Sequence, residues 1–572
     1  MTARSSILTA VLILLFTADT LTAQDDPECR ELVLYNGKIV TMDARDTIAT
    51  TVTIRNDRIV EVGTGAGVPE HSACAVAIDL RGRTVVPGLI DIHDHPVALG
   101  QRPGYDTRLD TAASLADVQS LIRARAAALK PGAWITAIGG WNPVQFAEKR
   151  LPTKSELDEA APDHPVLLWA SGTFLPLPGA SSATTVTNTL GKTFFEAGGI
   201  TVDADGGLPN ASRNAALNAL RALQTPDDRI RGMLDALSYF ARLGLTTHLD
   251  MGGAWPANPA WNGKVETSDG GLSFLDPISG YNPLIALHRD GKLPVRLRLF
   301  FYVQDLKADA RLVRERMNNQ SFGLGDDWVR VSGMGERIAG GEFDQENHPT
   351  AQYEAAVRAV AERGWSYQQH ANGPQDARAI TELWEKVNAT IPLAPLRWTL
   401  AHVYGIDAQT LGRLKAMGAG VSVGGGRYLN RGGQDPPFRT IVESGIAAGY
   451  GGDGPNPSPV NPWLHVYYMV SGKNAAGESN SSGQTLSRLE ALRLYTRGGA
   501  WFTKEEDKLG SIEAGKLADL AVLSDDVLDS ERVPDEAIKR VTSVLTIVGG
   551  RIVYGTGVPA PLRSPALNSV AR

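Results

Sequence analysis

Two histidines separated by one residue end an apolar stretch early in the chain. Residues 85–96 read VVPGLIDIHDHP, and His93 and His95 stand at the close of the apolar part. On a strand, alternate side chains share a face, so both imidazoles should point the same way, together with Asp91. Two converging imidazoles at a strand end are a natural pair of metal ligands. The alternative is two packed or exposed histidines without a ligand.

Three further apolar segments also end on residues that bind metals or move protons. They are residues 365–370, which close on His370, 397–402, which close on His402, and 446–453, which close on Asp453. A single terminal histidine is usually structural. Four such ends in order, at the carboxyl edge of parallel strands, predict one shared site.

The elements that must position these residues follow a β-then-α rhythm through the middle of the chain. Repeated units of this kind, beginning with the apolar run at 165–170, predict an α/β fold with an eight-stranded, TIM-like (β/α)8 barrel over residues 87–505. Residues 252–283 form a long Gly-, Asn- and Pro-rich insertion, which we interpret as a lid.

Short strands with turn residues flank the barrel on both sides. Residues 24–86 and 506–572 carry them, and either set alone would leave sheet edges unpaired. We therefore expect the two chain ends to combine into one small β-sandwich domain.

Composition narrows the function classes. The chain has 572 residues, a formal net charge of −7 and a sequence pI near 5.9, which argues against nucleic acid as a partner. Residues 1–23 have the layout of a cleavable signal peptide, with Arg4 before a short apolar core and Ala23 at the expected cleavage site. They predict a secreted or periplasmic protein with no membrane span after cleavage; the alternative is an uncleaved anchor.

The chain has two cysteines, Cys29 and Cys74. An oxidising compartment would allow a disulfide between them, whereas two unrelated thiols are the alternative.

The sequence resembles the amidohydrolase superfamily, in the amidohydrolase 3-like branch that includes N-substituted formamide deformylase. The resemblance covers nearly all of the mature chain. It is carried by the pair His93/His95, by His402 and Asp453, and by three motifs: NGKIV at 36–40, QHANG at 369–373 and LGSIEAGKLADL at 509–520.

This resemblance implies a metal-dependent hydrolase that cleaves a non-peptide C–N bond in a small molecule, such as an amide, formamide, carbamate or cyclic imide. It implies that His93, His95, His370, His402 and Asp453 bind the metal. Asp453 would also act as general base and acid, with His402 as the second catalytic residue. Zn2+ suits these ligands best, and one ion is favoured over two.

One position departs from the family pattern. Members with two metals carry a carbamylated lysine on the fourth strand, where Arg330 stands in this chain, and a guanidinium cannot form the carbamate. Either the site holds one metal, or Glu336 or Glu342 bridges two. Arg330 would then meet an acidic group of the substrate or make a structural ion pair.

Other candidates are weaker. His248 and Asp250 end another strand and fit a role behind the metal ligands or in packing. Trp141 and Asn142 follow two glycines and either line the substrate pocket or pack in the core.

Two other readings stay open at this stage. The altered fourth strand would suit a barrel that only binds a ligand, or a metal-assisted lyase or isomerase. A carbohydrate-active barrel would need two opposed acids at strand ends, which the histidine-rich rim disfavours. The sequence leaves the substrate undetermined and allows a homo-oligomer.

Overall fold

The computed structural model describes residues 30–171, 184–252, 280–303, 305, 307–429, 433–455, 457–479 and 483–556, together with the backbone of 562–563. The expected signal peptide, Cys29 and most of the expected lid lie outside these residues. Within the described ranges, no helix combines the length and the apolar character that a membrane crossing requires.

Eight parallel strands position the candidate site, in two sheets of four. The first sheet has the order β15-β14-β13-β8, and the second has the order β16-β17-β18-β19. Every neighbouring pair within them is parallel. The strands are β8 (Leu89–Asp94), β13 (Leu245–Asp250), β14 (Arg296–Phe301), β15 (Val329–Met334), β16 (Gln368–His370), β17 (Thr399–His402), β18 (Gly420–Gly424) and β19 (Ala447–Gly451).

The two parallel sheets meet at both of their outer strands. A parallel bridge joins Met334 to Tyr367, between β15 and β16, and the backbone N–H of Asp453 donates to the His93 carbonyl at 2.7 Å, between β19 and β8. The strands thus follow one another in chain order, as in a TIM-barrel-like α/β fold. Most of their residues are buried, which is why they read as apolar runs in the sequence.

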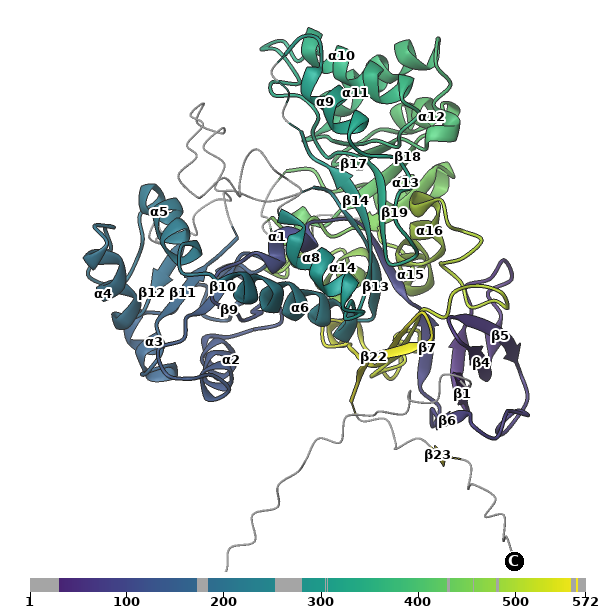
Figure 1. Ribbon diagram of the computed structural model, residues 1–572, viewed down its shortest axis with the longest axis horizontal. Helices are drawn as coiled ribbons and strands as arrows, with labels where there is room; N and C mark the ends of the chain where they lie inside the picture. The colour runs from purple at the N-terminus through teal and green to yellow at the C-terminus, as the bar shows by residue number, and fades with distance from the viewer. Residues whose placement is uncertain are drawn as a thin grey trace, which may run out of the picture.

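Helices follow or separate these strands and cover them (Figure 1). Several begin with a side-chain cap, as where the Thr225 hydroxyl accepts the backbone N–H of Asp228 at the start of α6. The helices around the eight strands are α1 (Pro96–Gly100), α6 (Pro226–Arg242), α8 (Asn282–Arg289), α9 (Arg311–Asn318), α10 (Ala351–Glu362), α11 (Pro374–Asn388), α12 (Ala408–Ala416), α13 (Phe438–Ser444), α14 (Pro462–Ser471), α15 (Arg488–Tyr495) and α16 (Arg497–Thr503).

An inserted unit separates β8 from β13 and has a sheet of its own, to the left in Figure 1. Its sheet has the order β12-β11-β10-β9, and an apolar cluster that includes Val118, Ile135 and Leu168 forms its core. The run at 165–170, which we expected among the barrel strands, lies here instead. The unit comprises β9 (Tyr105–Asp106), α2 (Leu115–Ala127), β10 (Ile135–Ile138), α3 (Lys154–Ala160), β11 (Val166–Trp169), β12 (Thr185–Thr187), α4 (Thr189–Ala197) and α5 (Asn210–Arg221).

Strands from both chain ends form two further sheets. In the order β22-β21-β20-β7-β2-β3, the central strand β7 pairs with β2 from the start of the chain and with β20 from its end. The other sheet has the order β23-β6-β1-β4-β5, and one apolar cluster, with Leu34 and Val522 among its members, draws on both sheets. The expected joining of the chain ends is therefore present, while a single β-sandwich domain stays a prediction.

The strands of these two sheets are short. They are β1 (Glu31–Tyr35), β2 (Lys38–Val40), β3 (Ile48–Ala49), β4 (Thr51–Arg55), β5 (Arg58–Gly63), β6 (Val76–Asp79), β7 (Thr84–Pro87), β20 (Leu520–Leu523), β21 (Ser543–Val548), β22 (Arg551–Gly555) and β23 (Leu562–Arg563), with the helix α17 (Asp535–Ile538) between β20 and β21.

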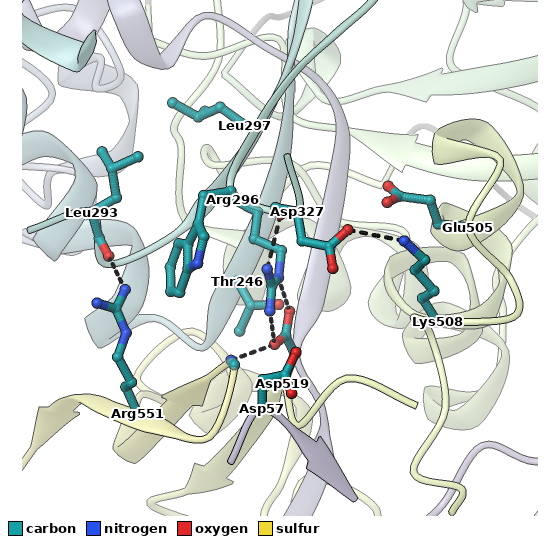
Figure 2. A network of polar contacts seen from close by, with 12 residues as sticks. Asp57, Thr246, Leu293, Arg296, Leu297, Asp327, Glu505, Lys508, Asp519 and Arg551 are labelled. Atoms are coloured by element: carbon teal, nitrogen blue, oxygen red, sulfur yellow. Dashed lines mark hydrogen bonds and ion pairs between the residues drawn. The ribbon is translucent and has the colours of Figure 1, made fainter. Parts of the chain in front are cut away.

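Buried ion pairs fasten the parallel strands to the C-terminal part of the chain. Arg296 of β14 donates from Nε and Nη2 to the two carboxylate oxygens of Asp519, at 2.7 and 2.9 Å, and only 1% and 4% of these side chains are exposed. Figure 2 shows this pair. The backbone N–H of Gly549 donates to the same carboxylate at 2.8 Å. Next to it, Arg298 forms a second two-bond pair with Glu505, at 2.6 and 3.1 Å. Such fork-shaped pairs fix geometry as well as charge.

Candidate metal centre

Six side chains meet at the carboxyl ends of five of the parallel strands. His93 and His95 follow from β8, Glu336 comes just after β15, His370 ends β16, His402 ends β17, and Asp453 comes just after β19. The structure therefore brings together all five residues that the sequence singled out, and adds Glu336, one of the two candidate bridging residues.

The first donor group consists of His93, His95 and Asp453. Nε2 of His93 lies 3.7 Å and Nε2 of His95 lies 3.6 Å from the same oxygen, Oδ1 of Asp453. All three residues are buried.

In both His93 and His95, the ring nitrogen that points away from the site, Nδ1, has a fixed partner. Nδ1 of His95 donates to the Gly252 carbonyl at 3.1 Å, and Nδ1 of His93 contacts the amide oxygen of Gln368, whose Nε2 donates to the Ile92 carbonyl. These oxygens only accept hydrogen bonds, so Nδ1 of each ring carries a proton, and Nε2 is the nitrogen that faces the site, where it binds either a second proton or a metal ion. The sequence analysis missed Gln368, although its position two residues before His370 on the same strand was a signal for it.

The second donor group consists of His93, Glu336 and His402. Oε2 of Glu336 lies 3.4 Å from Nε2 of His93, 3.3 Å from Nε2 of His402 and 2.7 Å from Nδ1 of His370. Its other oxygen, Oε1, lies 3.8 Å from Nε2 of His95. A single carboxylate therefore faces all four imidazoles.

The backbone is unusual at two of the site residues, His402 and Asp453, and at Val403, which follows His402. His402 has a φ of 70°, Val403 of 46° and Asp453 of 56°, all in the left-handed region. Non-glycine residues rarely adopt this region, least of all β-branched ones, and such positions cluster at functional sites. The surrounding hydrogen bonds hold the geometry, as where Asp453 N–H donates to the His93 carbonyl at 2.7 Å.

The charges in the site depend on one another. Burial opposes ionisation of Glu336, but the imidazoles of His370, His402 and His93 outweigh it and hold its pKa well below the ordinary value. Burial likewise disfavours a charged His95, yet the carboxylates of Asp453 and Glu336 raise its pKa to about 10. Both carboxylates are thus in their anionic form, stabilised by positive charge nearby.

The donor atoms fit a divalent cation. Nε2 of His93 and Nδ1 of His402 are buried and form no hydrogen bond with any described residue. Nε2 of His370 lies 2.7 Å from Oδ1 of Asn372, whose Nδ2 donates to Asp376, so Nε2 is the donor in this contact and Nδ1 is the nitrogen that faces Glu336. Acceptor atoms that face one another in a buried site need a cation among them. Imidazole nitrogens and carboxylate oxygens are the ligands that suit zinc.

The fourth-strand candidates lie in three different places, and Arg330 makes the structural ion pair that was one of its two expected roles. Arg330 is the second residue of β15 and donates to Glu505 and Asp327, both at 2.9 Å. At about 3.3 Å per residue, it stands roughly 13 Å from the strand's carboxyl end, so it does not take the lysine's place beside the histidines. Glu342 accepts hydrogen bonds from Arg337 at 2.7 Å and from Gln369 at 3.1 Å. Of the three candidates, only Glu336 lies at the centre.

The weaker candidates make local contacts. Nδ1 of His248 lies 3.5 Å from Asp94, and Asp250 accepts the Tyr281 hydroxyl at 2.8 Å, so both lie behind the first donor group. Trp141 donates to the Ala137 carbonyl at 3.2 Å, and the Asn142 side chain donates to the Ser171 carbonyl at 2.7 Å. All four side chains are buried.

The expected disulfide is described at one end. Cys74 is disulfide-bonded. Cys29 lies outside the described residues, so the pairing of these two cysteines stays a prediction.

Comparisons with known proteins agree with this fold. The chain is 27% identical to the N-substituted formamide deformylase of Arthrobacter pascens, over 88% of this chain and 95% of that protein. In structure it resembles an uncharacterised metal-dependent hydrolase of Pyrococcus horikoshii, with a TM-score of 0.56, 17% identity and coverage of 87% and 98%. It also resembles a variant of the atrazine chlorohydrolase of Arthrobacter aurescens complexed with zinc and atraton, with a TM-score of 0.50, 15% identity and coverage of 92% and 95%.

A family model settles the classification. The model described as "Amidohydrolase family" matches residues 76–554, which is most of the chain. The resemblance inferred from the sequence is confirmed, and so is the enzyme class, a metal-dependent amidohydrolase that acts on carbon–nitrogen bonds other than peptide bonds. The chain belongs to the amidohydrolase family.

Proposed function

We propose that this protein hydrolyses an amide-type bond of a small molecule, such as a formamide, amide, carbamate or cyclic imide, at the mouth of a closed (β/α)8 barrel. The observation that carries the proposal is the convergence of four imidazoles and two carboxylates at one end of the parallel strands. The named activity of the deformylase relative supports the choice of bond.

We propose Zn2+ as the metal. His93, His95 and Asp453 would hold one ion, and Glu336, His370 and His402 complete the donor set. When bound, a divalent cation lowers the pKa of a water molecule toward neutrality and polarises the scissile carbonyl. Glu336 faces both donor groups, and together with His370 and His402 it would hold a second ion.

Asp453 would move the proton in this reaction. Burial raises the pKa of its carboxyl, but His402, His95 and His93 together lower this pKa by more than burial raises it. The carboxyl is therefore ionised at neutral pH and ready to accept a proton. It would take the proton from the attacking water while a C–O bond forms, and pass it to the nitrogen as the C–N bond breaks. A formamide or an amide gives a carboxylic acid and an amine, whereas a cyclic imide opens to one molecule that carries both the acid and an amide. His402, with Nδ1 at 3.6 Å from Asp453 Oδ2, would hold this carboxylate in position.

Elemental analysis and a substrate screen test the proposal together. Purified protein should contain a stoichiometric divalent metal and turn over members of a panel of N-formyl and N-acyl compounds. The variants His93→Ala and Asp453→Asn should lose this activity, while His288→Gln, which changes a half-buried histidine paired with Asp326, should keep it. Turnover that survives in either site variant would overturn the assignment.

We also propose that the protein is exported and that Cys29 pairs with Cys74. The signal-like residues 1–23 and the disulfide-bonded state of Cys74 support this. Amino-terminal sequencing of the mature protein should begin at Gln24, and non-reducing peptide mapping should find the two cysteines in one linked pair. A mature protein that retains Met1 would refute cleavage.

A further inference from the structure

A cavity lies outside the metal centre, beside the inserted unit. It has a volume of about 270 Å³ and is bounded by α6, by the segment after α1, by α2 and by Tyr554 of β22. Figure 1 shows α6 between the inserted sheet and the parallel strands. The charged side chains that line this cavity are five arginines and two aspartates: Arg102, Arg108, Arg125, Arg231, Arg242, Asp106 and Asp235.

The two aspartates are already engaged with two of the arginines. Arg108 forms an ion pair with Asp106, and Arg231 lies 3.4 Å from Asp235 and over the ring of Tyr105 at 3.8 Å. Among the residues that the structure describes, no carboxylate pairs with Arg102, Arg125 or Arg242. The arginines outnumber the aspartates, so the lining of the cavity carries an excess of positive charge, and these like charges repel one another.

Of these three arginines, which have no carboxylate partner within the described residues, Arg102 gives the strongest evidence for a bound anion. It is 91% buried, since its relative exposure is 9%, and its Nη1 makes no hydrogen bond within the described part of the chain. Burial and the neighbouring charge of Arg108 lower its pKa to about 9. A buried guanidinium with a free N–H group is costly unless an acceptor completes its hydrogen bonds.

We propose that this arginine-lined cavity binds a small oxyanion, of the phosphate or carboxylate class. The planar, doubly donating guanidinium group matches both kinds of oxyanion, and the cavity is smaller than the roughly 300–1,000 Å³ typical of drug-sized ligands. Nothing in the hydrolysis proposed above uses these residues.

One hydrogen bond links this cavity to the loop of the metal centre. Nη2 of Arg102 donates to the carbonyl of Pro455 at 3.2 Å, two residues beyond Asp453. An anion that engaged Nη1 would therefore share this guanidinium with the loop that carries Asp453.

Binding to the full-length protein tests the proposal without any substrate. Isothermal titration with sodium phosphate and with sodium malonate, at an ionic strength held constant with sodium chloride, should give saturable binding of at least one anion. Binding of phosphate but not malonate identifies a tetrahedral oxyanion as the ligand class, and binding of malonate but not phosphate identifies a carboxylate. Binding of both identifies the chemistry that the two classes share. No saturable binding of either anion would overturn the proposal.

Matched variants separate this cavity from the metal centre. Arg125→Gln and Arg242→Gln should each weaken binding by about tenfold or more, because each loses a charge-assisted contact. Arg123→Gln, an exposed residue on the same helix as Arg125, should bind as the wild type does. Undiminished binding in both cavity variants would place the anion elsewhere and overturn the proposal.

A measurement on the wild-type protein guards against variants that fail to fold. Phenylglyoxal modifies accessible arginines, and peptide mass spectrometry reports the extent at each residue. The anion should protect Arg125 and Arg242 but not Arg123. Equal modification of all three with and without the anion would contradict the proposal.

Discussion

Both carboxylate oxygens of Asp91 accept the backbone N–H of Gly452, at 3.1 and 3.0 Å. This contact joins β8 to the residue that directly precedes Asp453. The same carboxylate accepts the backbone N–H of His93 at 3.0 Å, so one buried group sets the positions of a histidine and an aspartate of the metal centre.

Replacing this acceptor should loosen the site. In Asp91→Asn one oxygen becomes an amide NH2 group, which cannot accept a hydrogen bond from Gly452. We expect metal affinity or activity to fall by about 10- to 100-fold, as is typical when a group behind the ligands is lost. Metal titration and steady-state kinetics check this, and an Asp91→Asn protein with wild-type values in both would contradict it.

The close approach of β19 to β8 should make Gly451 intolerant of any side chain. A Cβ atom there would lie 2.4 Å from Cβ of His93 and 2.5 Å from Oγ of Ser422. Gly451→Ala should therefore displace His93 and lower both metal content and thermal stability. A control is Gly412→Ala on α12, where no atom lies within 4 Å and a gain of up to about 1 kcal/mol is expected. Equal thermal midpoints for the two variants would refute the argument.

Glu336 and Glu342 offer a matched test of the donor set. Glu336→Gln replaces the carboxylate that faces four imidazoles, so bound metal should decrease and activity should fall by at least about 100-fold. Glu342→Gln changes a carboxylate bound to Arg337 and Gln369, so metal content should be retained. Elemental analysis decides between them: two equivalents in the wild type and one in Glu336→Gln would identify Glu336 as a bridging ligand.

The buried pair Arg296–Asp519 should be a large contributor to stability once formed. Asp519→Asn leaves a buried guanidinium without its counter-charge, which costs about 3–5 kcal/mol in comparable cases. The control Glu315→Gln removes an exposed pair with Arg311 and should cost less than about 0.5 kcal/mol. Urea unfolding measures both. A free energy of unfolding of Asp519→Asn that lies within about 1 kcal/mol of the wild-type value would show that the pair is dispensable.

His465 should give the protein a pH-dependent stability below neutrality. Burial lowers its pKa from 6.5 to about 3, while Ser458 and Tyr495 hydrogen-bond its ring at 3.0 and 2.8 Å. Between these pH values the unfolded chain binds a proton that the folded chain does not, so the free energy of unfolding falls as the pH drops below 6.5.

The slope identifies this histidine. A single proton changes the free energy of unfolding by at most about 1.4 kcal/mol per pH unit, and His465→Gln removes that share. Thermal midpoints of the two proteins, compared from about pH 8 down to about pH 5, should fall less steeply in the variant. Parallel curves would exclude His465 as the source.

The sequence predicted the positions of those site residues whose placement depends on a single strand. His93, His370 and His402 each end an apolar run, and the strands deliver them to one edge, as their alternation and position predicted. The partners that fix them, such as Gln368 and the Gly252 carbonyl, depend on contacts between distant segments, and no local pattern specifies those.

The errors have the same origin. The run at β11 has the apolar character of a barrel strand, but periodicity does not say which sheet a strand joins, and it lies in the inserted unit. Arg330 stands on the strand that carries the family's lysine, whereas the residue beside the histidines, Glu336, comes after this strand has ended. Burial and register between elements, rather than propensity, decided both cases.

The double pairing of β7 has a consequence for how the chain is made. During synthesis β2 is already present when β7 leaves the ribosome, so these two strands can pair early. The other edge of β7 stays unpaired until residues 520–523 have been synthesised and form β20. Throughout that interval a row of backbone amides and carbonyls remains available to any other extended chain. A product cut short before this last segment would keep that open edge permanently, and we expect it to aggregate rather than to fold into a smaller enzyme.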